Sequence, residues 1–233
     1  MARSLFGSMK VIIPAKASSS RVINKNWRPF YGEQSLVDIT ITKLRNAGCN
    51  RKDIYVSCED TRLLMECRRT HGVQTLNRSI ELCKNETDIT KVVRSICGEL
   101  ADETEIGYAQ VCSPTFDEYR DCFDKWIQHR SQFDSLAVAY AADSYVMMSQ
   151  QQTMNPLGWS FGNCHPMSQR AAKLYTMPFA FSILTQRSLR ETGYYCGRNP
   201  IWHVAAGNHI DIDTMQDFED AQAIYAARQA KPR

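Results

Sequence analysis

Short apolar runs alternate with amphipathic stretches along most of the chain, and each type has its own spacing. The apolar runs have the length of buried strands, and we expect strands at residues 11–15, 53–57, 72–76, 105–112, 179–184 and 201–205. The amphipathic stretches repeat every three to four positions and predict helices at residues 34–47, 61–71, 88–100, 115–130 and 213–227. Alternation of this kind favours right-handed crossovers, so we predict an α/β fold with a mostly parallel central sheet and helices on both faces.

Two of the predicted helices carry end signals. In the first helix, Leu36 and Leu44 share one face, and Gly48 follows where a residue in the left-handed conformation commonly ends a helix. Before the helix that runs to about residue 130, Thr115 and Glu118 have the spacing of a capping box.

The regular pattern fails between about Ala142 and Leu174. Turn formers such as Asn155–Gly158 are mixed there with aromatic residues. Irregular loops of this length in a compact domain are usually functional or disordered, so we predict a protruding irregular segment at residues 142–174. The alternative is an ordinary loop that packs its aromatic side chains back on the body of the protein.

Composition and charge exclude several classes of protein. The 28 Lys and Arg residues nearly balance the 25 Asp and Glu residues, which leaves a net charge of +3. A wide basic stripe for nucleic acid is therefore not indicated. No apolar stretch approaches the roughly 20 residues that cross a bilayer, and residues 1–8 have too little apolar length for a signal peptide. We expect a single cytoplasmic domain at residues 9–233, without nucleic-acid or membrane partners, after a disordered extension at residues 1–8.

The nine cysteines do not predict a metal site or a disulfide framework. Their number is odd, no Cys-x-x-Cys pair occurs, and the spacing fits no zinc template. Many lie within apolar segments, where a reduced cysteine packs as a small hydrophobic side chain. The histidines show no zinc-like pair spacing either.

A cationic turn follows the first predicted strand. Lys16, Arg21, Lys25 and Arg28 are spaced through a stretch that also holds the small residues Ser18–Ser20. A flexible loop with several cations can wrap a polyanion. This cationic turn, residues 16–28, therefore predicts a site for a nucleotide triphosphate.

An acidic pair lies near the other end of the chain, at Asp211 and Asp213. In an extended segment both carboxylates lie on one side and Ile212 on the other. Two carboxylates together with phosphate oxygens and water suit Mg²⁺. The alternative is structural: Asp213 or Thr214 caps the last helix, with Asp217 completing the cap.

Several enzyme classes are excluded because their motifs are missing. The glycine fingerprint of dinucleotide-binding dehydrogenases does not follow the first strand. The Gly-Lys-Ser/Thr of P-loop proteins and the Gly-x-Ser-x-Gly of nucleophile-elbow hydrolases are also absent from the sequence.

The order and separation of the remaining motifs resemble the cytidylyltransferases that activate acidic sugars, above all the CMP-N-acylneuraminate (CMP-sialic acid) synthetases. The resemblance covers most of the chain. The matching segments are Ile13–Ala15, Ser19, Lys25, Asn26, Val56–Asp60, Arg78, Gln110–Pro114 and Ile210–Phe218.

This resemblance implies a three-layer αβα, Rossmann-like nucleotidyltransferase fold. It implies transfer of CMP from CTP to the anomeric hydroxyl of an acidic sugar, with Mg²⁺ as cofactor, pyrophosphate as product and a homodimer that pairs through the protruding segment. The residues expected to bind the nucleotide are Ala15, Lys16, Ser19, Arg21, Lys25, Asn26, Arg78 and Gln110. Those expected to bind the sugar are Gln110, Ser168, Gln169 and Arg170. Asp211 and Asp213 would hold the metal, and together with Lys25 they would be catalytic.

The chain departs from the family pattern at several positions. Lys16 stands where the family usually has arginine, which replaces a bidentate contact by a point charge. The cationic turn has no glycine, and Phe116 replaces an arginine. These departures leave two alternatives open: a related enzyme with another sugar, such as a keto-octonate, or another nucleotide, and a catalytically silent relative that binds nucleotide or sugar.

Overall fold

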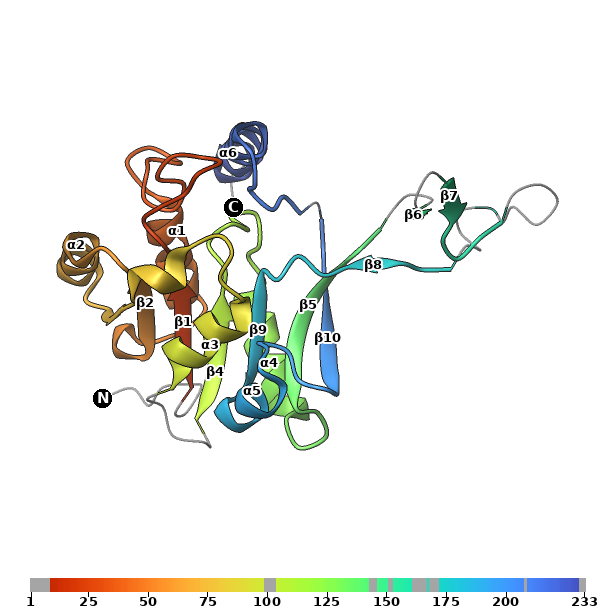
Figure 1. Ribbon diagram of the computed structural model, residues 1–233, viewed down its shortest axis with the longest axis horizontal. Coiled ribbons are helices and arrows are strands. Elements are labelled where there is room, and N and C mark those ends of the chain that lie inside the picture. Colours follow the sequence, from red (N-terminus) through yellow and green to blue (C-terminus); the bar gives the residue numbers. More distant parts are fainter. Residues whose placement is uncertain are drawn as a thin grey trace.

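The computed structural model describes residues 9–98, 104–142, 146–150, 153–160, 167, 172–207 and 209–230. A twisted sheet runs through the centre of the body, with strand order β10-β5-β9-β4-β1-β2-β3 and β8 paired to β5 (Figure 1). Its strands are β1 (Lys10–Pro14), β2 (Ile54–Cys58), β3 (Gln74–Asn77), β4 (Glu105–Ala109), β5 (Ser135–Ala141), β8 (Tyr175–Thr176), β9 (Phe181–Thr185) and β10 (Pro200–Ala205). The helices are α1 (Leu36–Asn46), α2 (Thr61–His71), α3 (Ile89–Cys97), α4 (Tyr119–His129), α5 (Gln186–Thr192) and α6 (Met215–Ala230).

The sheet is mostly parallel, as predicted, but one central strand runs the other way. Strand β1 pairs in parallel with β2 and β4, β2 with β3, and β10 with β5. Strand β9 lies antiparallel between β4 and β5. The chain reaches β9 from the protruding segment, not through a helical crossover, which explains its reversed direction.

Helices cover both faces of the sheet, and the period-two alternation of β1 shows how. Val11 and Ile13 belong to the larger core cluster, which includes the apolar sides of α1 and α4. Ile12 belongs to the second cluster, with residues of α3 and α5. Successive side chains of a strand point to opposite faces, so the three layers of the predicted α/β fold are confirmed.

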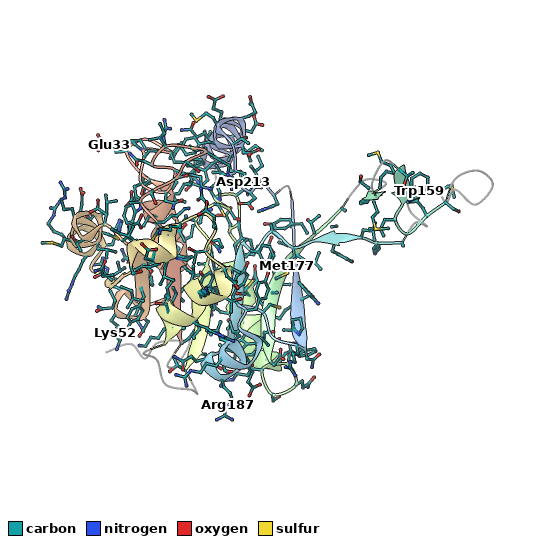
Figure 2. All side chains as sticks on the ribbon, in the orientation of Figure 1. Glu33, Lys52, Trp159, Met177, Arg187 and Asp213 are labelled. Atoms are coloured by element: carbon teal, nitrogen blue, oxygen red, sulfur yellow. The ribbon has the colours of Figure 1, made fainter. Side chains whose placement is uncertain are left out.

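The protruding segment is confirmed, but it is not irregular throughout. It contains the antiparallel pair β6 (Met147–Gln150) and β7 (Thr153–Pro156), which projects away from the body (Figure 1). The Trp159 indole donates to the Val146 carbonyl at 3.2 Å, within the projection. Trp159 is therefore far from Asp213 on the body (Figure 2), and its ring does not pack back on the core.

Several local predictions are wrong for identifiable reasons. Thr115 and Glu118 form no capping box: α4 begins at Tyr119 without a side-chain cap, and the Glu118 carboxylate instead binds His203 at 2.6 Å and the Ala206 amide at 2.8 Å. The strand expected to reach Cys112 ends at Ala109. Strand β5 and helix α5 were not predicted at all.

Three further predictions concern residues 1–8, the cysteines and membrane-spanning segments. The predicted extension at residues 1–8 lies outside the described residues. The eight cysteines within the described part are free thiols, and six of them are buried, which agrees with a packing role. In the same residues, no helix is both long and apolar enough to span a bilayer.

Candidate active site

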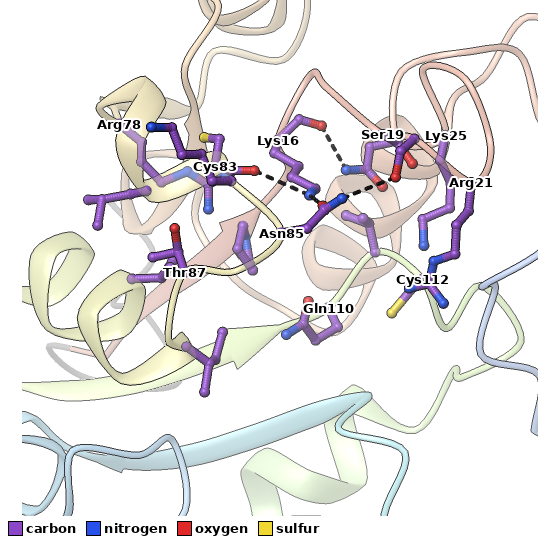
Figure 3. Close-up of a pocket in the computed structure, with 18 of the residues that line it drawn as sticks. Lys16, Ser19, Arg21, Lys25, Arg78, Cys83, Asn85, Thr87, Gln110 and Cys112 are labelled. Atoms are coloured by element: carbon purple, nitrogen blue, oxygen red, sulfur yellow. Dashed lines mark hydrogen bonds between the residues drawn. The ribbon is translucent and has the colours of Figure 1, made fainter.

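A cavity of about 610 Å³ opens beyond the carboxyl ends of β1 and β4 (Figure 3). Four separate segments border it: the cationic turn, the stretch from Arg78 to Val92, the end of β4 with the residues after it, and Asp213. Ligands of open α/β sheets bind outside the carboxyl ends of the strands. The fold therefore gathers residues from both ends of the sequence at the place where such folds bind their substrates.

The structure brings the cationic turn and Asp213 together across this crevice, whereas Asp211 is not among the residues that border the cavity. The Arg21 guanidinium lies 2.7 Å from a carboxylate oxygen of Asp213. The Lys25 ammonium donates to the carbonyl of Ile212, between the two aspartates. Most of the predicted site residues border the cavity, namely Lys16, Ser19, Arg21, Lys25, Asn26, Arg78, Gln110 and Asp213.

Glu59, at the end of β2, holds the start of the cationic turn. Its carboxylate accepts hydrogen bonds from the Ala17 amide at 3.0 Å and from the Ser18 amide and hydroxyl, both at 3.0 Å. Burial alone would raise the pKa of Glu59, but the backbone donors around it lower that pKa from 4.5 to about 2. Glu59 is therefore charged at neutral pH and replaces the glycine-rich geometry that the turn lacks.

Two further side chains fix the turn from inside. The buried Asn26 amide donates to the Lys16 carbonyl at 2.9 Å, and the Trp27 indole donates to the Ala15 carbonyl at 3.1 Å. Ala15 itself is fully buried and does not border the cavity. Asn24 has φ of 54°, a left-handed conformation that asparagine tolerates better than most residues and that turns the loop back.

Arg78 follows β3 and is buried at the opposite end of the cavity from Arg21 and Lys25 (Figure 3). Only 8% of it is exposed, and its nearest carboxylate oxygen, on Glu59, is 3.9 Å away. Its Nε and Nη2 atoms have no hydrogen-bond partner in the described residues. Buried charged donors are normally paired, so these two atoms are suited to a ligand.

The acidic segment shows both the predicted placement of its two carboxylates and the predicted helix cap. Ile212 is fully buried, and its amide donates to the Cys112 carbonyl at 3.0 Å, which places Asp211 and Asp213 on the outer side. Thr214 and Asp217 form the cap of α6: the Thr214 amide donates to Asp217 at 2.7 Å, and the Asp217 amide donates to the Thr214 hydroxyl at 3.2 Å. The Asp213 side chain takes no part in this cap and is free to face the crevice.

The acidic pair fits a hard divalent cation only together with a substrate. The described residues contain no cluster of three or more acidic, histidine or cysteine side chains able to hold a metal. Mg²⁺ commonly uses one or two carboxylates, with phosphate oxygens and water completing its shell. Asp211 lies beside the Cys112 thiol, whose pKa is raised by burial and then by the charge of Asp211.

Some residues at the site escaped the sequence analysis. Asn85, Cys83 and Thr87 border the cavity from the stretch before α3 (Figure 3). Tyr108 and Cys112 border it from the side of β4. No motif marks the first group, because its role depends on a fold that returns residues 83–87 to the cationic turn. Ser168, Gln169 and Arg170, expected at the sugar, lie outside the described residues.

Comparisons of the sequence with known proteins support nucleotidyltransferase activity for this chain. Among solved structures, the fold is similar to a CMP-2-keto-3-deoxy-manno-octonic acid synthetase solved with CTP, with a TM-score of 0.62 at 14% identity, over 95% of this chain and 100% of the other. It is also similar to 4-diphosphocytidyl-2C-methyl-D-erythritol synthase from Anaerococcus prevotii, with a TM-score of 0.62 at 11% identity, over 97% of this chain and 100% of the other.

Residues 10–113 match the model of the cytidylyltransferase family. The chain is 25% identical over 224 residues to the pseudaminic acid cytidylyltransferase of Campylobacter jejuni, covering 92% of this chain and 94% of the relative. It is 22% identical over 212 residues to the N-acylneuraminate cytidylyltransferase of Streptococcus agalactiae, covering 89% of this chain and 51% of that longer protein. These matches confirm the resemblance to the acidic-sugar cytidylyltransferases that the motifs indicated.

Proposed function

We propose that the protein transfers CMP from CTP to the anomeric hydroxyl of an acidic 2-keto sugar, sialic acid or a related nonulosonate, with Mg²⁺ as cofactor. The observation that carries the proposal is the convergence of the cationic turn and the acidic pair on one crevice, with Arg21 and Asp213 2.7 Å apart. Phosphoryl transfer needs positioning and charge neutralisation more than covalent chemistry, and this crevice supplies groups for both.

Residues of the cationic turn bind one part of the nucleotide, and Arg78 at the opposite end of the cavity binds another. Lys16, Arg21 and Lys25 neutralise the triphosphate. Arg78, whose buried Nε and Nη2 atoms have no hydrogen-bond partner within the described residues, donates to the other half of the nucleotide. Gln110, bordering the cavity between these two groups, faces the α-phosphate and the incoming sugar.

The chemical step forms one bond and breaks one bond. The anomeric hydroxyl oxygen attacks the α-phosphorus, the bond from that phosphorus to the bridging oxygen breaks, and pyrophosphate leaves with the electron pair. The hydroxyl proton passes to the carboxylate of Asp211 or Asp213. Asp211 and Asp213 would hold Mg²⁺, which would supply charge neutralisation for the leaving group.

The experiment that tests this function measures pyrophosphate release. Purified protein is incubated with Mg²⁺, each of the four nucleoside triphosphates, and a panel of acidic sugars that includes nonulosonates and a keto-octonate. Release with CTP and a nonulosonate supports the proposal. Release only with the keto-octonate or with another nucleotide supports an enzyme of the same fold with a different substrate. CTP binding without release from any pair supports a silent binding relative.

We also propose that two copies of the chain associate through the open face of β5 and β10 and the projecting hairpin. Trp202 and Val204 on the edge strand β10 are 43% and 48% exposed, and with Tyr175 they border an apolar cavity of about 420 Å³. The hairpin adds the exposed side chains of Met148 and Met154. Exposed apolar side chains of this kind suit a self-complementary interface.

Association is tested by sedimentation equilibrium of the wild type and of Trp202→Glu. We expect a wild-type dimer and a dissociation constant at least about 30-fold higher for the variant, because buried aromatic anchors commonly contribute about 2 kcal/mol or more. Lys52→Glu, a charge change on the exposed far edge of the body, is the control and leaves the dimer intact. A monomeric wild type would contradict the proposal.

A further inference from the structure

Asn85 joins two loops that are far apart in sequence. Its side-chain oxygen accepts from the Lys16 ammonium at 2.8 Å, and its side-chain nitrogen donates to the Ser20 hydroxyl at 3.2 Å (Figure 3). Both partners belong to the cationic turn, 69 and 65 positions earlier in the chain. A single amide thus bridges the stretch before α3 to two residues that border the same cavity.

The orientation of the Asn85 amide is fixed by chemistry. A lysine ammonium only donates hydrogen bonds, so the oxygen of the amide must face Lys16. The NH₂ group then faces Ser20, and the Ser20 oxygen becomes an acceptor. A hydroxyl that accepts in this direction keeps its own hydrogen available for another partner.

Lys16 is oriented in the same way. Its ammonium donates to Asn85 and, at 3.3 Å, to the carbonyl of Cys83. An ammonium has three donors, so one N–H is left over after these two contacts. Lysine has a long flexible side chain with high rotamer entropy. Fixing its ammonium group before a ligand arrives lowers the entropy that is lost when the ligand binds.

We propose that Asn85 is a positioning residue for the polyphosphate, because it turns the remaining N–H of Lys16 and the hydroxyl hydrogen of Ser20 together toward the crevice. The turn has no glycine, and at position 16 it has a lysine in place of the planar arginine that would impose this geometry by itself. The inference rests on the proposed function only in that the bound anion is the triphosphate of a nucleotide.

The experiment measures binding of CTP and of inorganic triphosphate by titration calorimetry, without any sugar. Asn85→Ala is expected to lower the affinity for both ligands about three- to tenfold. This is the size expected when hydrogen bonds, neutral or charge-assisted, are lost. In a Lys16→Ala/Ser20→Ala background, adding Asn85→Ala should change either affinity by less than about 1.5-fold, since the residues through which it acts are gone.

Asn85→Asp tests whether the hydrogen-bonding pattern of Asn85 matters separately from the size of its side chain. The side chain keeps its size, but a carboxylate has no donor, so the Ser20 hydroxyl turns toward it and the Lys16 charge is neutralised. We expect this variant to bind CTP more weakly than Asn85→Ala. Asn50→Ala is the control, because the Asn50 side chain makes no capping hydrogen bond, and it should leave both affinities unchanged.

Three results would overturn the proposal: an unchanged affinity in Asn85→Ala, an effect of full size in the Lys16→Ala/Ser20→Ala background, or wild-type affinity in Asn85→Asp. Because no sugar and no turnover enter the assay, a failure of CMP transfer with intact triphosphate binding would contradict the proposed function alone. A wild type that binds no triphosphate would overturn both.

Discussion

The cationic turn and the acidic segment face each other across the crevice, but they are held in place by different means. The turn is braced from within the chain by Glu59, Asn26 and Asn85, which bind its backbone and the heads of its side chains. The acidic segment is fixed by its backbone and by one buried side chain, Ile212, while Asp213 reaches across to Arg21.

This difference follows from the sign of the charge that each side must present. Several cations gathered in one loop repel each other, and a carboxylate behind the loop offsets that repulsion before any ligand arrives. The two aspartates have no such brace in the described residues, and the cations nearest to them come from the opposite side of the crevice. The turn is therefore braced before any ligand arrives, whereas the charge of the acidic segment is offset only from across the crevice.

The sharpest test of the comparison removes charge from the acidic side. We expect Asp211→Asn and Asp213→Asn each to lower the rate of CMP transfer at least about 100-fold, because a loss of about 3 kcal/mol in transition-state stabilisation has this effect. The melting temperature should stay close to that of the wild type, since neither side chain caps α6. Asp220→Asn, an exposed carboxylate on the same helix, is the control for steady-state kinetics, and a full rate in either variant contradicts the metal assignment.

Removing charge from the turn should mainly affect binding. Lys25→Ala is expected to lower the affinity for CTP roughly tenfold or more, because hydrogen bonds to charged groups contribute about 1.5–3 kcal/mol. Lys25→Arg should recover part of the affinity, and Lys52→Ala serves as an exposed control. If calorimetry shows the same CTP affinity in Lys25→Ala as in the wild type, Lys25 does not belong to the phosphate site.

The brace behind the turn can be tested through stability. The pKa of Glu59 is lowered from 4.5 to about 2, so its charged form stabilises the folded state by about 2–3 kcal/mol, fully above pH 4.5 and progressively less as the pH falls toward 2. Glu59→Gln should lower the free energy of unfolding by this amount at pH 7, and the gap to the wild type should close in acid. Urea denaturation between pH 2.5 and 7 measures it, and a gap that does not depend on pH would assign Glu59 a packing role only.

The smallest effect concerns the ion pair between the two sides. Arg21 and Asp213 are both substantially exposed, and exposed ion pairs contribute about 0.2–1 kcal/mol. Without nucleotide, Arg21→Ala should therefore raise the affinity for Mn²⁺, used as a paramagnetic probe, by about 1.4- to fivefold. Arg62→Ala, far along the chain on α2, is the control. An unchanged Mn²⁺ affinity in Arg21→Ala would show that Arg21 does not compete for the acidic pair.

Much of the body could be predicted because its local signals agree with its tertiary contacts. Helix α2 occupies the predicted residues 61–71, with Asp60 as its cap and Gly72 at its end in the left-handed conformation. Strand β1 was recognised from its apolar run. Strand β5 was missed because its small residues, as in Ala137 and Ala139, give a weak hydrophobic signal although the whole strand except its last residue is buried.

Site residues could be predicted where their placement follows from neighbours in the sequence. They could not be predicted where their role depends on contacts that only the fold creates. The spacing of Asp211, Ile212 and Asp213 is enough to place both carboxylates on one side. Asn85 carries no such signal, because an asparagine between two charged residues looks like an ordinary loop residue until the fold sets it against Lys16. Glu118 shows the converse: its spacing from Thr115 suggested a helix cap, but a partner on β10 was stronger than the local one.

The position of β9 connects the projecting hairpin to the loop after β4. The chain leaves the body at the end of β5, returns along β8, and then enters the middle of the sheet, where the Ala180 carbonyl accepts from the Gln110 amide at 3.1 Å. The returning strand has only a few residues between the hairpin's base and that hydrogen bond. A displacement of the hairpin would therefore be transmitted through this short connection to Gln110, which borders the cavity.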